Sequence, residues 1–379
     1  MNRLRNEMPV TAKWAYFDHA ALAPLTAPAA QRMQALARES AEQGDIPWPD
    51  WMKEYEATRA TAARMVGAGV DEIALVPSTT AGINLVSEGL DWHEGDNVVT
   101  LADEFPSNLY PWIHLESRGV ETRRVETDNG RLDLKRLAST CDNRTRLVSV
   151  SWVGYQTGYR LDLDDVAQVA HSAGALFFVD AIQGLGVFPL DVAKTPIDFF
   201  SSGGQKWLLG PEGTSVTYIR REHLEELRPI GVGWNSVARP YDYNHIELKF
   251  QATAARFEGG GMNLPGLITL GKSLDLLDAI GASALAERIL EYTDLACERL
   301  ASAGAVVTTD RDLTHRTGEQ RSGIVFFELP GRDPVEVRKE CIARGIVLSC
   351  RAGKLRISPH AYNSEDDLER LIEVVNSNS

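Results

Sequence analysis

Short apolar runs alternate with amphipathic stretches between about residues 60 and 220, and this alternation is the strongest constraint on the fold. The runs are rich in β-branched and aromatic residues and alternate little with polar ones, as expected of strands that are buried on both faces of a parallel sheet. They cover residues 73–76, 97–101, 147–151, 176–179 and 215–219. Intervening stretches such as 163–173 have helical periodicity. The pattern predicts right-handed βαβ units and an α/β fold with a mostly parallel sheet flanked by helices.

The character of the sequence changes after residue 265. Residues 266–302 predict long helices, and a mixed order of strands and helices follows: a strand at 323–329, a helix at 334–344, strands at 346–349 and 355–358, and a helix at 364–376. This β-α-β-β-α order predicts a small α+β domain. We therefore predict a large domain over 30–265 and a small domain formed by 1–29 and 266–379, which includes a connecting helix.

Polar side chains follow three of the predicted strands. Asp180 closes the run 175–179, the group Ser78-Thr79-Thr80 follows the run 73–76, and Lys206 follows a strand-like segment at 198–202. In open α/β sheets, ligands bind beyond the carboxyl ends of the strands. We therefore expect these side chains to face one crevice.

Lys206 and Asp180 together indicate a particular cofactor. A buried lysine beside glycine-rich backbone commonly forms a Schiff base with a carbonyl. A carboxylate at a neighbouring strand end is the usual partner of a pyridinium nitrogen, and an ionised Asp180 among apolar neighbours needs such a cation. The alternative for Asp180 is a structural role in which it caps the next helix. The pair predicts a pyridoxal phosphate (PLP) site.

The segment from Ser78 to Gly82 precedes a predicted helix at 83–90. Free N–H groups and the positive dipole end at a helix N-terminus bind phosphate, and hydroxyl groups add donors. The alternative is that Ser and Thr only cap the helix. Because Lys206 and Asp180 are expected in the same crevice, the phosphate interpretation is favoured.

Charge and cysteine content limit the function classes. The net charge is −14, and no basic block occurs, which disfavours nucleic acid and anionic membranes as partners. The four cysteines are scattered without CxxC pairs, so neither a disulfide framework nor a structural metal site is expected. The first residues lack the apolar core of a signal peptide, and no apolar run is long enough to span a bilayer. We expect a cytoplasmic protein.

Five motifs occur in an order that resembles one enzyme family. They are Asp18-His19-Ala20-Ala21, Thr79-Thr80, Asp180-Ala181-Ile182-Gln183, Gln205-Lys206-Trp207-Leu208-Leu209-Gly210-Pro211 and Arg356-Ile357-Ser358-Pro359-His360. Together they resemble the class V aminotransferase-like PLP enzymes, the group that contains cysteine desulfurases, selenocysteine lyases and isopenicillin N epimerase-like proteins. The resemblance covers roughly residues 16–375. It implies the PLP-dependent transferase fold of type I and a homodimer with active sites shared between the subunits.

The resemblance also implies roles for individual residues. Lys206 would hold the cofactor aldehyde, Asp180 would pair with the ring nitrogen, and Gln183 would bond the phenolic oxygen. The phosphate would be held by Thr79, Thr80 and Gln205. Arg356 would bind the substrate carboxylate, which suits a planar guanidinium with two parallel donors. Ala21 and Trp234 are further predicted substrate contacts.

Four positions differ from the desulfurase pattern. Phe105 replaces a histidine that stacks on the cofactor ring, and phenylalanine can stack but cannot transfer protons. Trp152 replaces an asparagine near the phenolic oxygen, and Gly203 replaces a serine. Gly261 replaces a threonine that reaches the phosphate of the partner subunit, a contact that the N–H groups of Gly260 and Gly261 can also make.

A desulfurase also needs a mobile cysteine that accepts sulfur. Cys350 is the nearby candidate, but it lies only six residues before Arg356 (356 − 350) and at a strand end. We interpret it as a passive small apolar residue rather than a persulfide carrier. The sequence does not identify a sulfur acceptor.

The predicted reaction is therefore β-elimination from a cysteine-type amino acid by a C–S lyase. The alternatives within the family are an epimerase and an aminotransferase. Two alternatives from other classes are a non-catalytic scaffold and a P-loop nucleotide hydrolase, since Gly266 to Ser273 matches GxxxxGK[ST]. No strand is expected before Gly266, and the inner positions continue an apolar helical pattern, so we interpret this match as accidental.

Overall fold

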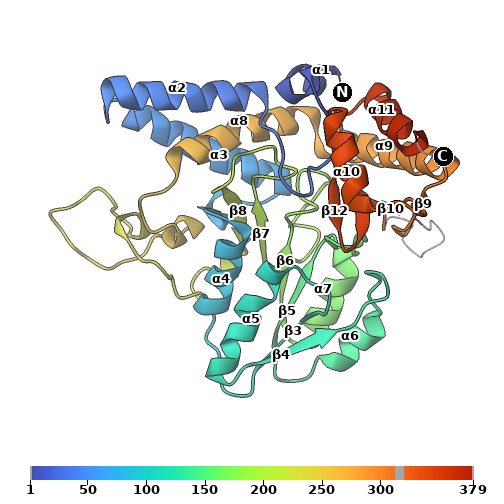
Figure 1. Ribbon diagram of the computed structural model, residues 1–379. Coiled ribbons are helices and arrows are strands. Elements are labelled where there is room, and N and C mark those ends of the chain that lie inside the picture. The colour runs from blue at the N-terminus through green and yellow to red at the C-terminus, as the bar shows by residue number, and fades with distance from the viewer. Residues whose placement is uncertain (1, 312–319, 378–379) are drawn as a thin grey trace.

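A seven-stranded sheet forms the centre of the molecule in the computed structural model, which describes residues 2–311 and 320–377 (Figure 1). The strand order is β2-β8-β7-β6-β5-β3-β4. The strands are β2 (Ile73–Val76), β3 (Asn97–Leu101), β4 (Glu121–Val125), β5 (Thr145–Ser151), β6 (Leu176–Asp180), β7 (Phe199–Gly203) and β8 (Ser215–Ile219). The pairs from β7 to β4 are parallel, and β8 is antiparallel to both β7 and β2. The predicted α/β fold with a mostly parallel sheet is confirmed.

Alternate residues of the central strands pack into two separate cores. Phe177 and Val179 of β6 belong to one apolar cluster, whereas Phe178 between them belongs to another. Side chains of a strand point alternately to its two faces, so the sheet is buried on both sides and the molecule has three layers. This explains why the runs are apolar throughout rather than alternating.

Helices cover both faces of this sheet (Figure 1). Two long helices from the first part of the chain pack against α8, and α4 packs against β7 and β8. The helices up to α8 are α1 (Asn2–Asn6), α2 (Ala27–Gln43), α3 (Trp48–Val66), α4 (Thr79–Gly89), α5 (Tyr110–His114), α6 (Leu134–Thr140), α7 (Leu163–Ser172) and α8 (Leu264–Ile280). At Gly82, an added Cβ would lie 2.2 Å from the Ser201 hydroxyl, so the close approach of α4 to β7 requires glycine there.

The C-terminal part forms a second sheet, with the order β12-β13-β10-β9, beside α9 (Ala282–Ser302), α10 (Pro334–Ala343) and α11 (Glu365–Asn376). Its strands are β9 (Val306–Val307), β10 (Val325–Glu328), β12 (Ser349–Arg351) and β13 (Lys354–Ile357). The short strands β1 (Ala15–Tyr16) and β11 (Ile346–Val347) pair in parallel, which attaches the start of the chain to this part. The predicted division into domains 30–265 and 1–29 plus 266–379 remains a prediction.

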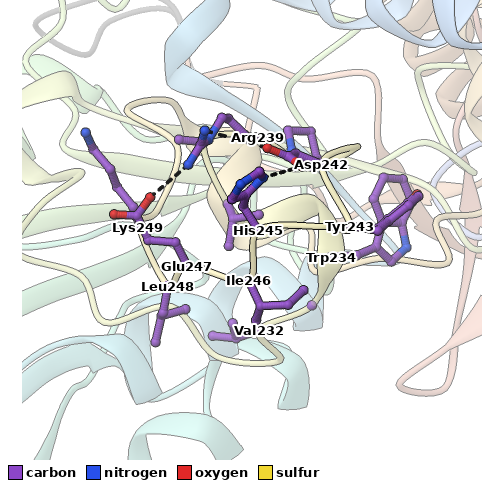
Figure 2. A pocket seen from close by; sticks show the side chains of 14 residues that line it. Val232, Trp234, Arg239, Asp242, Tyr243, His245, Ile246, Glu247, Leu248 and Lys249 are labelled. Carbon is purple, nitrogen blue, oxygen red and sulfur yellow. Dashed lines mark hydrogen bonds and ion pairs between the residues drawn. The ribbon is translucent and has the colours of Figure 1, made fainter.

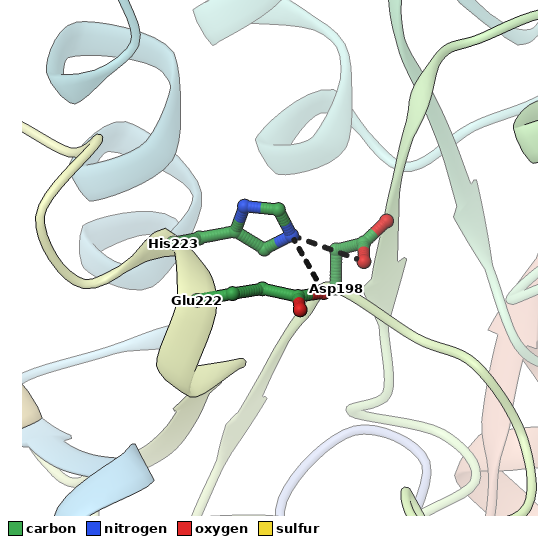
Figure 3. Close-up of side chains that lie close together, drawn as sticks. All are labelled: Asp198, Glu222 and His223. Atoms are coloured by element: carbon green, nitrogen blue, oxygen red, sulfur yellow. Dashed lines mark hydrogen bonds and ion pairs between the residues drawn. The ribbon is translucent and has the colours of Figure 1, made fainter.

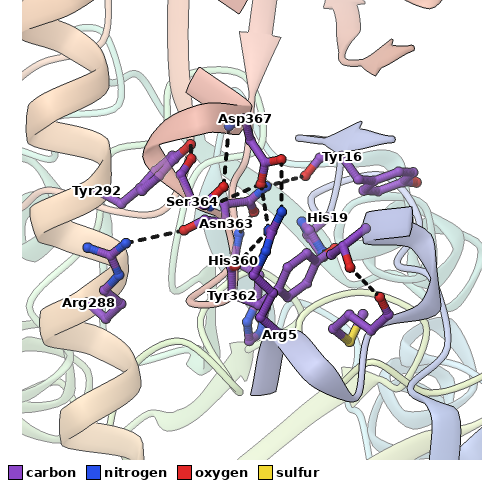
Figure 4. Close-up of polar contacts among 12 residues, drawn as sticks. Arg5, Tyr16, His19, Arg288, Tyr292, His360, Tyr362, Asn363, Ser364 and Asp367 are labelled. Carbon is purple, nitrogen blue, oxygen red and sulfur yellow. Dashed lines mark hydrogen bonds and ion pairs between the residues drawn. The ribbon is translucent and has the colours of Figure 1, made fainter. Parts of the chain in front are cut away.

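Polar contacts fix the N-terminal segment against the C-terminal part (Figure 4). Arg5 forms an ion pair with Asp367 at 2.8 Å. The two ring nitrogens of the buried His19 contact the Ser358 carbonyl and the Tyr362 hydroxyl, each at 2.9 Å. The motif that begins at Asp18 is thereby held rigidly beside the motif that begins at Arg356.

The segment 231–262 extends away from the rest of the chain (Figure 1). It lines a cavity of about 470 Å³ with apolar side chains, among them Trp234 and Tyr243 (Figure 2). Its side chains are unusually exposed, with Ile246 at 91% and Leu248 at 71% of full exposure. None of the described helices combines the length and the apolar character that crossing a bilayer requires.

Candidate active site

The carboxyl ends of six strands lie at one edge of the central sheet. Since β8 is antiparallel to both of its neighbours, β2 points in the same direction as β7, β6, β5, β3 and β4. The N-terminus of α4, Phe105, Trp152, Asp180 and Lys206 therefore follow strand ends on the same edge. The residues predicted to share a crevice therefore lie on one edge of the sheet, which is the edge where open α/β sheets bind ligands.

Lys206 lies in a tight turn after β7. The Leu209 N–H donates to the Lys206 carbonyl at 3.0 Å, and the Gly210 N–H donates to the Gly204 carbonyl at 2.8 Å. Leu209 has φ of +56° although it is not glycine, a conformation that the surrounding hydrogen bonds maintain. Burial lowers the pKa of the Lys206 amine to about 8, with Asp180 acting in the opposite direction. The amine therefore has a substantial neutral fraction near neutral pH, which a nucleophile or proton acceptor needs.

Asp180 is buried at the end of β6, with 2% of its surface exposed. Its Oδ1 accepts from the Ile182 N–H at 3.1 Å, and its backbone carbonyl accepts from the Trp152 N–H at 3.0 Å. Burial raises the pKa of this carboxyl to about 6, while the Ile182 N–H and the charge of Lys206 lower it. A cationic partner would keep Asp180 ionised, as a pyridinium nitrogen would.

The N-terminus of α4 offers free donors beside Lys206. Ser78 caps this helix, and its hydroxyl accepts from the Ala81 N–H at 3.1 Å. Thr79 does not cap; its hydroxyl accepts from the Gly203 N–H at 2.8 Å, which joins α4 to the strand before Lys206. At Gly203, an added Cβ would lie 2.4 Å from the Gln205 side-chain oxygen and 3.1 Å from the Thr79 hydroxyl. The space that a serine side chain would need here is taken, which explains the glycine.

Gln183 has a fixed orientation. Its Oε1 accepts from the Trp207 indole N–H at 2.8 Å, and its Nε2 donates to the Ala20 carbonyl at 3.0 Å. These two bonds leave one N–H of the amide for another acceptor. Trp207 thus determines which end of the Gln183 amide carries the remaining donor, a role that sequence motifs alone did not indicate.

Arg356 is buried, with 2% of its surface exposed, at the centre of β13. Its Nε donates to the Ser349 hydroxyl at 3.0 Å and its Nη2 to Asp18 Oδ1 at 3.1 Å, and Nη1 lies 3.5 Å from the Tyr155 carbonyl. A guanidinium has five N–H donors, so a pair remains for a carboxylate. Asp18 orients Arg356 without using up its donors.

Glu104, the residue before Phe105, belongs to none of the five sequence motifs. Its Oε1 accepts from the Ser151 N–H at 2.6 Å, and its Oε2 contacts the Ser151 hydroxyl. Burial raises the pKa of the Glu104 carboxyl to about 8, so that it is mostly protonated at pH 7. The ring of Phe105 lies 5.8 Å from Lys206 Nζ and packs edge-on against Tyr155 at 5.0 Å. Glu104 therefore anchors the loop that carries Phe105.

Other predicted residues have different surroundings. The Trp152 ring packs beside Phe188 at 5.9 Å, and an added Cβ at Gly184 would lie 2.2 Å from that indole. Trp234 packs against Tyr241 at 5.8 Å and lines the cavity in 231–262. The N–H of Ala21 donates to the Asp18 carbonyl at 3.0 Å. Roles of Trp152, Trp234 and Ala21 toward cofactor or substrate remain predictions.

Gly260 and Gly261, the predicted phosphate contacts in 231–262, lie on an exposed turn. An added Cβ at Gly260 would lie 2.6 Å from the Trp234 indole nitrogen, and Gly261 has φ of +62°. Both positions therefore favour glycine. Their role also remains a prediction.

The residues at this edge fit pyridoxal phosphate. A lysine amine of lowered pKa matches the aldehyde, a buried carboxyl matches the ring nitrogen, and a helix N-terminus matches the phosphate. Phe105 supplies an aromatic face. The glycine at 203 lets the side chains of Thr79 and Gln205 lie close to the backbone before Lys206.

A second cluster of chemically reactive groups lies at the opposite edge of the sheet (Figure 3). Asp198, at the start of β7, is bonded by His171 at 2.8 Å and His223 at 3.2 Å, and Arg220 Nε lies 3.3 Å away. Glu222 lies beside Asp198 and His223. Arg220 supplies positive charge to Asp198, so we interpret this cluster as a structural link between β7 and the neighbouring chain.

The P-loop match lies within helix α8. Gly266 to Lys272 belong to α8, whose N-cap is Asn263, and Lys272 forms an ion pair with Glu54 at 3.0 Å. A P-loop requires a strand before the glycines and bare backbone amides around the phosphates. Neither occurs here, so the match is accidental.

Comparisons with known proteins agree with this geometry. The family model for class V aminotransferases matches residues 15–371. A probable cysteine desulfurase from Methanothermobacter thermautotrophicus is 29% identical over 98% of this chain and 96% of its own length. A cysteine desulfurase from Cronobacter sakazakii is 32% identical over 85% of this chain and 82% of its own length. The apo cysteine desulfurase from Thermococcus onnurineus superimposes with a TM-score of 0.87 at 25% identity, covering 99% and 97% of the two chains.

The fold and the site define a PLP-dependent enzyme of fold type I. The chain belongs to the class V aminotransferase family. This confirms the fold, the family and the cofactor predicted from the five motifs.

Proposed function

We propose that this enzyme is a cysteine-type C–S lyase that acts by β-elimination. It takes L-cysteine or an S-substituted cysteine and water to pyruvate, ammonia and sulfide or the corresponding thiol. The proposal rests on Lys206, Asp180 and Arg356 at one edge of the sheet, combined with the cysteine desulfurase relatives. The single observation that favours elimination over persulfide transfer is the orientation of Cys350.

The reaction needs a group that binds the amino acid and a group that moves its α-proton. Arg356 binds the α-carboxylate through its two remaining donors and so fixes the direction of the other bonds at Cα. The amine of Lys206 removes the proton from Cα, and the C–S bond at Cβ then breaks with loss of the thiolate. The lowered pKa of Lys206, about 8, suits a proton carrier near neutral pH.

Six residues besides Lys206 would hold the cofactor. Thr79, Thr80 and Gln205 would bind its phosphate, Gln183 would donate its remaining N–H to the phenolic oxygen, and Phe105 would stack on the ring. Asp180 would keep the ring nitrogen protonated. When bound, pyridoxal phosphate supplies an aldehyde that joins the substrate amine and a ring that withdraws electrons from Cα.

The side chain of Cys350 supports elimination without a protein-bound persulfide. Ser349 contacts Arg356 and Asp18 through its hydroxyl, at 3.0 and 2.8 Å, so this side chain faces the substrate position. Successive side chains of a strand point to opposite faces. Cys350 follows Ser349 in β12 and pairs with Leu355, which is buried in the C-terminal core. The thiol therefore points away from Arg356.

We expect Cys350→Ala to keep pyruvate and sulfide release from L-cysteine within about twofold of the wild-type rate, since the thiol points to the opposite face of β12 from Arg356. Pyruvate is measured by coupled lactate dehydrogenase and sulfide by methylene blue formation. Alanine as the product, with loss of turnover in Cys350→Ala, would identify a persulfide-forming desulfurase instead. Exchange of the Cα hydrogen with solvent, without pyruvate, would identify the epimerase alternative.

We also propose that the active enzyme is a homodimer in which the segment 231–262 of one subunit covers the active site of the other. The exposed apolar side chains Ile246, Leu248 and Tyr243 support this, because a surface of this kind is normally covered. The exposed N–H groups of Gly260 and Gly261 are then available to the partner's phosphate. Sedimentation equilibrium is expected to give a molar mass of about twice 41.7 kDa for the wild-type protein. The Ile246→Glu variant is expected to sediment with the mass of a monomer.

A cytoplasmic location completes the proposal. All four cysteines are free thiols, of which one is buried and three are partly accessible, as in a reducing compartment. Cell fractionation with an antibody to the chain tests this location.

A further inference from the structure

The hairpin of β12 and β13 carries two arginines on one face. Its turn is formed by Ala352 and Gly353, with φ of +48° and +76°. In its register, Ser349 is opposite Arg356, and Arg351 is opposite Lys354. Facing residues of an antiparallel pair, and residues two apart on one strand, share a face. Arg351 therefore projects from the same face as Arg356, nearer the tip of the hairpin.

The other face of this hairpin is occupied by the core. Leu355 is 1% exposed and belongs to the C-terminal apolar cluster. The face with Arg356 and Ser349 is thus directed toward Asp18, and the charges of both arginines act on Lys206. Arg351 itself is exposed.

Arg351 lacks the partner that its neighbour has. Lys354 forms an ion pair with Glu328 at 3.3 Å. In the part of the chain that the structure describes, Arg351 has no carboxylate within ion-pair distance, and its Nη1 contacts only the carbonyl of Cys350 at 3.3 Å. The charge of Arg351 nevertheless acts on two residues of the site. Burial is the largest cause of the lowered pKa of Lys206 and of Arg356, and the positive charge of Arg351 lowers both pKa values further.

The charges in the crevice leave this guanidinium available. Asp18 is bonded to Arg356, and Asp180 is reserved for the ring nitrogen, so neither carboxylate is free to neutralise Arg351. Once the α-carboxylate of a substrate is on Arg356, a second cation remains at the entrance, on the same strand face. A second anionic group on the substrate would satisfy it.

We propose that Arg351 is a specificity-determining residue that binds a distal carboxylate, so that the enzyme prefers amino acids whose side chain ends in an acidic group. This inference rests on the proposed function, and within that reaction it names S-substituted cysteines with a carboxylate beyond the sulfur as the preferred substrates. Free L-cysteine, which lacks that group, is the poorer substrate.

The test compares acids with their neutral amides of the same shape. Dissociation constants for L-glutamate and L-glutamine are measured from the change in cofactor absorbance of the holoenzyme. In addition, kcat/KM is measured for S-carboxymethyl-L-cysteine and S-carboxamidomethyl-L-cysteine. We expect the wild-type enzyme to favour each acid over its amide by about tenfold, the strength of a charge-assisted hydrogen bond.

Arg351→Gln is expected to reduce both ratios to about one, and Arg351→Glu to favour the amides. Lys354→Gln is the matched control, since it removes a cation from the facing position that already has a partner, and it is expected to leave the ratios unchanged. Equal affinity for glutamate and glutamine in the wild type, or a preference that survives Arg351→Gln, would overturn the proposal. Binding preference without elimination of either cysteine derivative would instead disprove the proposed function and leave the role of Arg351 intact.

Discussion

Replacing Lys206 by alanine is expected to reduce turnover by about 10⁴-fold or more, because one amine both binds the cofactor aldehyde and moves the α-proton. Borohydride reduction followed by peptide mass mapping is expected to label the wild-type protein at Lys206 and to leave Lys206→Ala unlabelled. The absorbance band of the lysine-bound cofactor should be absent from this variant. The size of the effect distinguishes a catalytic amine from a residue that only contributes charge.

The matched control for this experiment is Lys272→Ala. Lys272 is a partly exposed lysine of α8 that forms an ion pair with Glu54 of α3, and it is the lysine on which a P-loop would depend. We expect Lys272→Ala to retain the label and turnover within about twofold, since a surface ion pair contributes little. A wild-type protein that remains colourless after incubation with PLP would support the scaffold alternative, and activity that requires Lys272 rather than Lys206 would support the hydrolase.

Three strands that are buried on both faces were predicted with the bounds that the structure shows. The runs 73–76, 97–101 and 215–219 are β2, β3 and β8 with identical bounds. The strand β4 was missed because it lies at the sheet edge and reads Glu-Thr-Arg-Arg-Val, with mostly exposed or partly exposed side chains. The pairing of β1 with β11 was not predicted. Each strand has only two residues, and the two strands come from distant parts of the chain.

The candidate site could be predicted as far as its motifs extend. Lys206, Asp180 and the N-terminus of α4 each follow a recognisable strand, so local pattern and topology suffice to bring them together. Pairings between distant residues were not predictable, such as Asp18 with Arg356 or Trp207 with Gln183. The role of Glu104 could not be predicted, because its burial depends on Ser151, a residue of another strand that the sequence does not pair with it.

Asp180→Asn is expected to lower turnover by about 10²–10³-fold, comparable with the loss of one strong electrostatic contact in an active site. Asparagine keeps the shape and the bond to the Ile182 N–H but does not keep the ring nitrogen protonated. The electron withdrawal that assists removal of the α-proton is then lost. Because the α-proton is involved, the kinetic isotope effect with Cα-deuterated substrate should increase in this variant.

Glu104→Gln is the matched control, a second buried carboxyl at a neighbouring strand end. Its carboxyl has a pKa of about 8 and is mostly neutral at pH 7, so the amide replaces a neutral group of the same shape. Both hydrogen bonds to Ser151 can be retained. Turnover of Glu104→Gln at pH 7 is therefore expected within about threefold of the wild type. A loss as large as that of Asp180→Asn would show that the charge of Glu104, rather than its shape, is needed.

Removal of either buried carboxyl is expected to stabilise the cofactor-free protein at high pH. Burial raises the pKa of Glu104 from 4.5 to about 8 and that of Asp180 from 3.8 to about 6. At a pH between the ordinary and the raised pKa of a carboxyl, the folded chain holds a proton that the unfolded chain has lost. The free energy of unfolding therefore falls as pH rises through this range. In cofactor-free protein, Glu104→Gln should remove the decline between about pH 4.5 and 8, and Asp180→Asn the decline between about pH 4 and 6. Thermal unfolding at pH 4, 6 and 9 measures this: each variant should exceed the wild-type Tm at pH 9, even though Asp180→Asn is nearly inactive. A variant less stable than the wild type at pH 9 would mean that its carboxyl is ionised and satisfied in the folded chain.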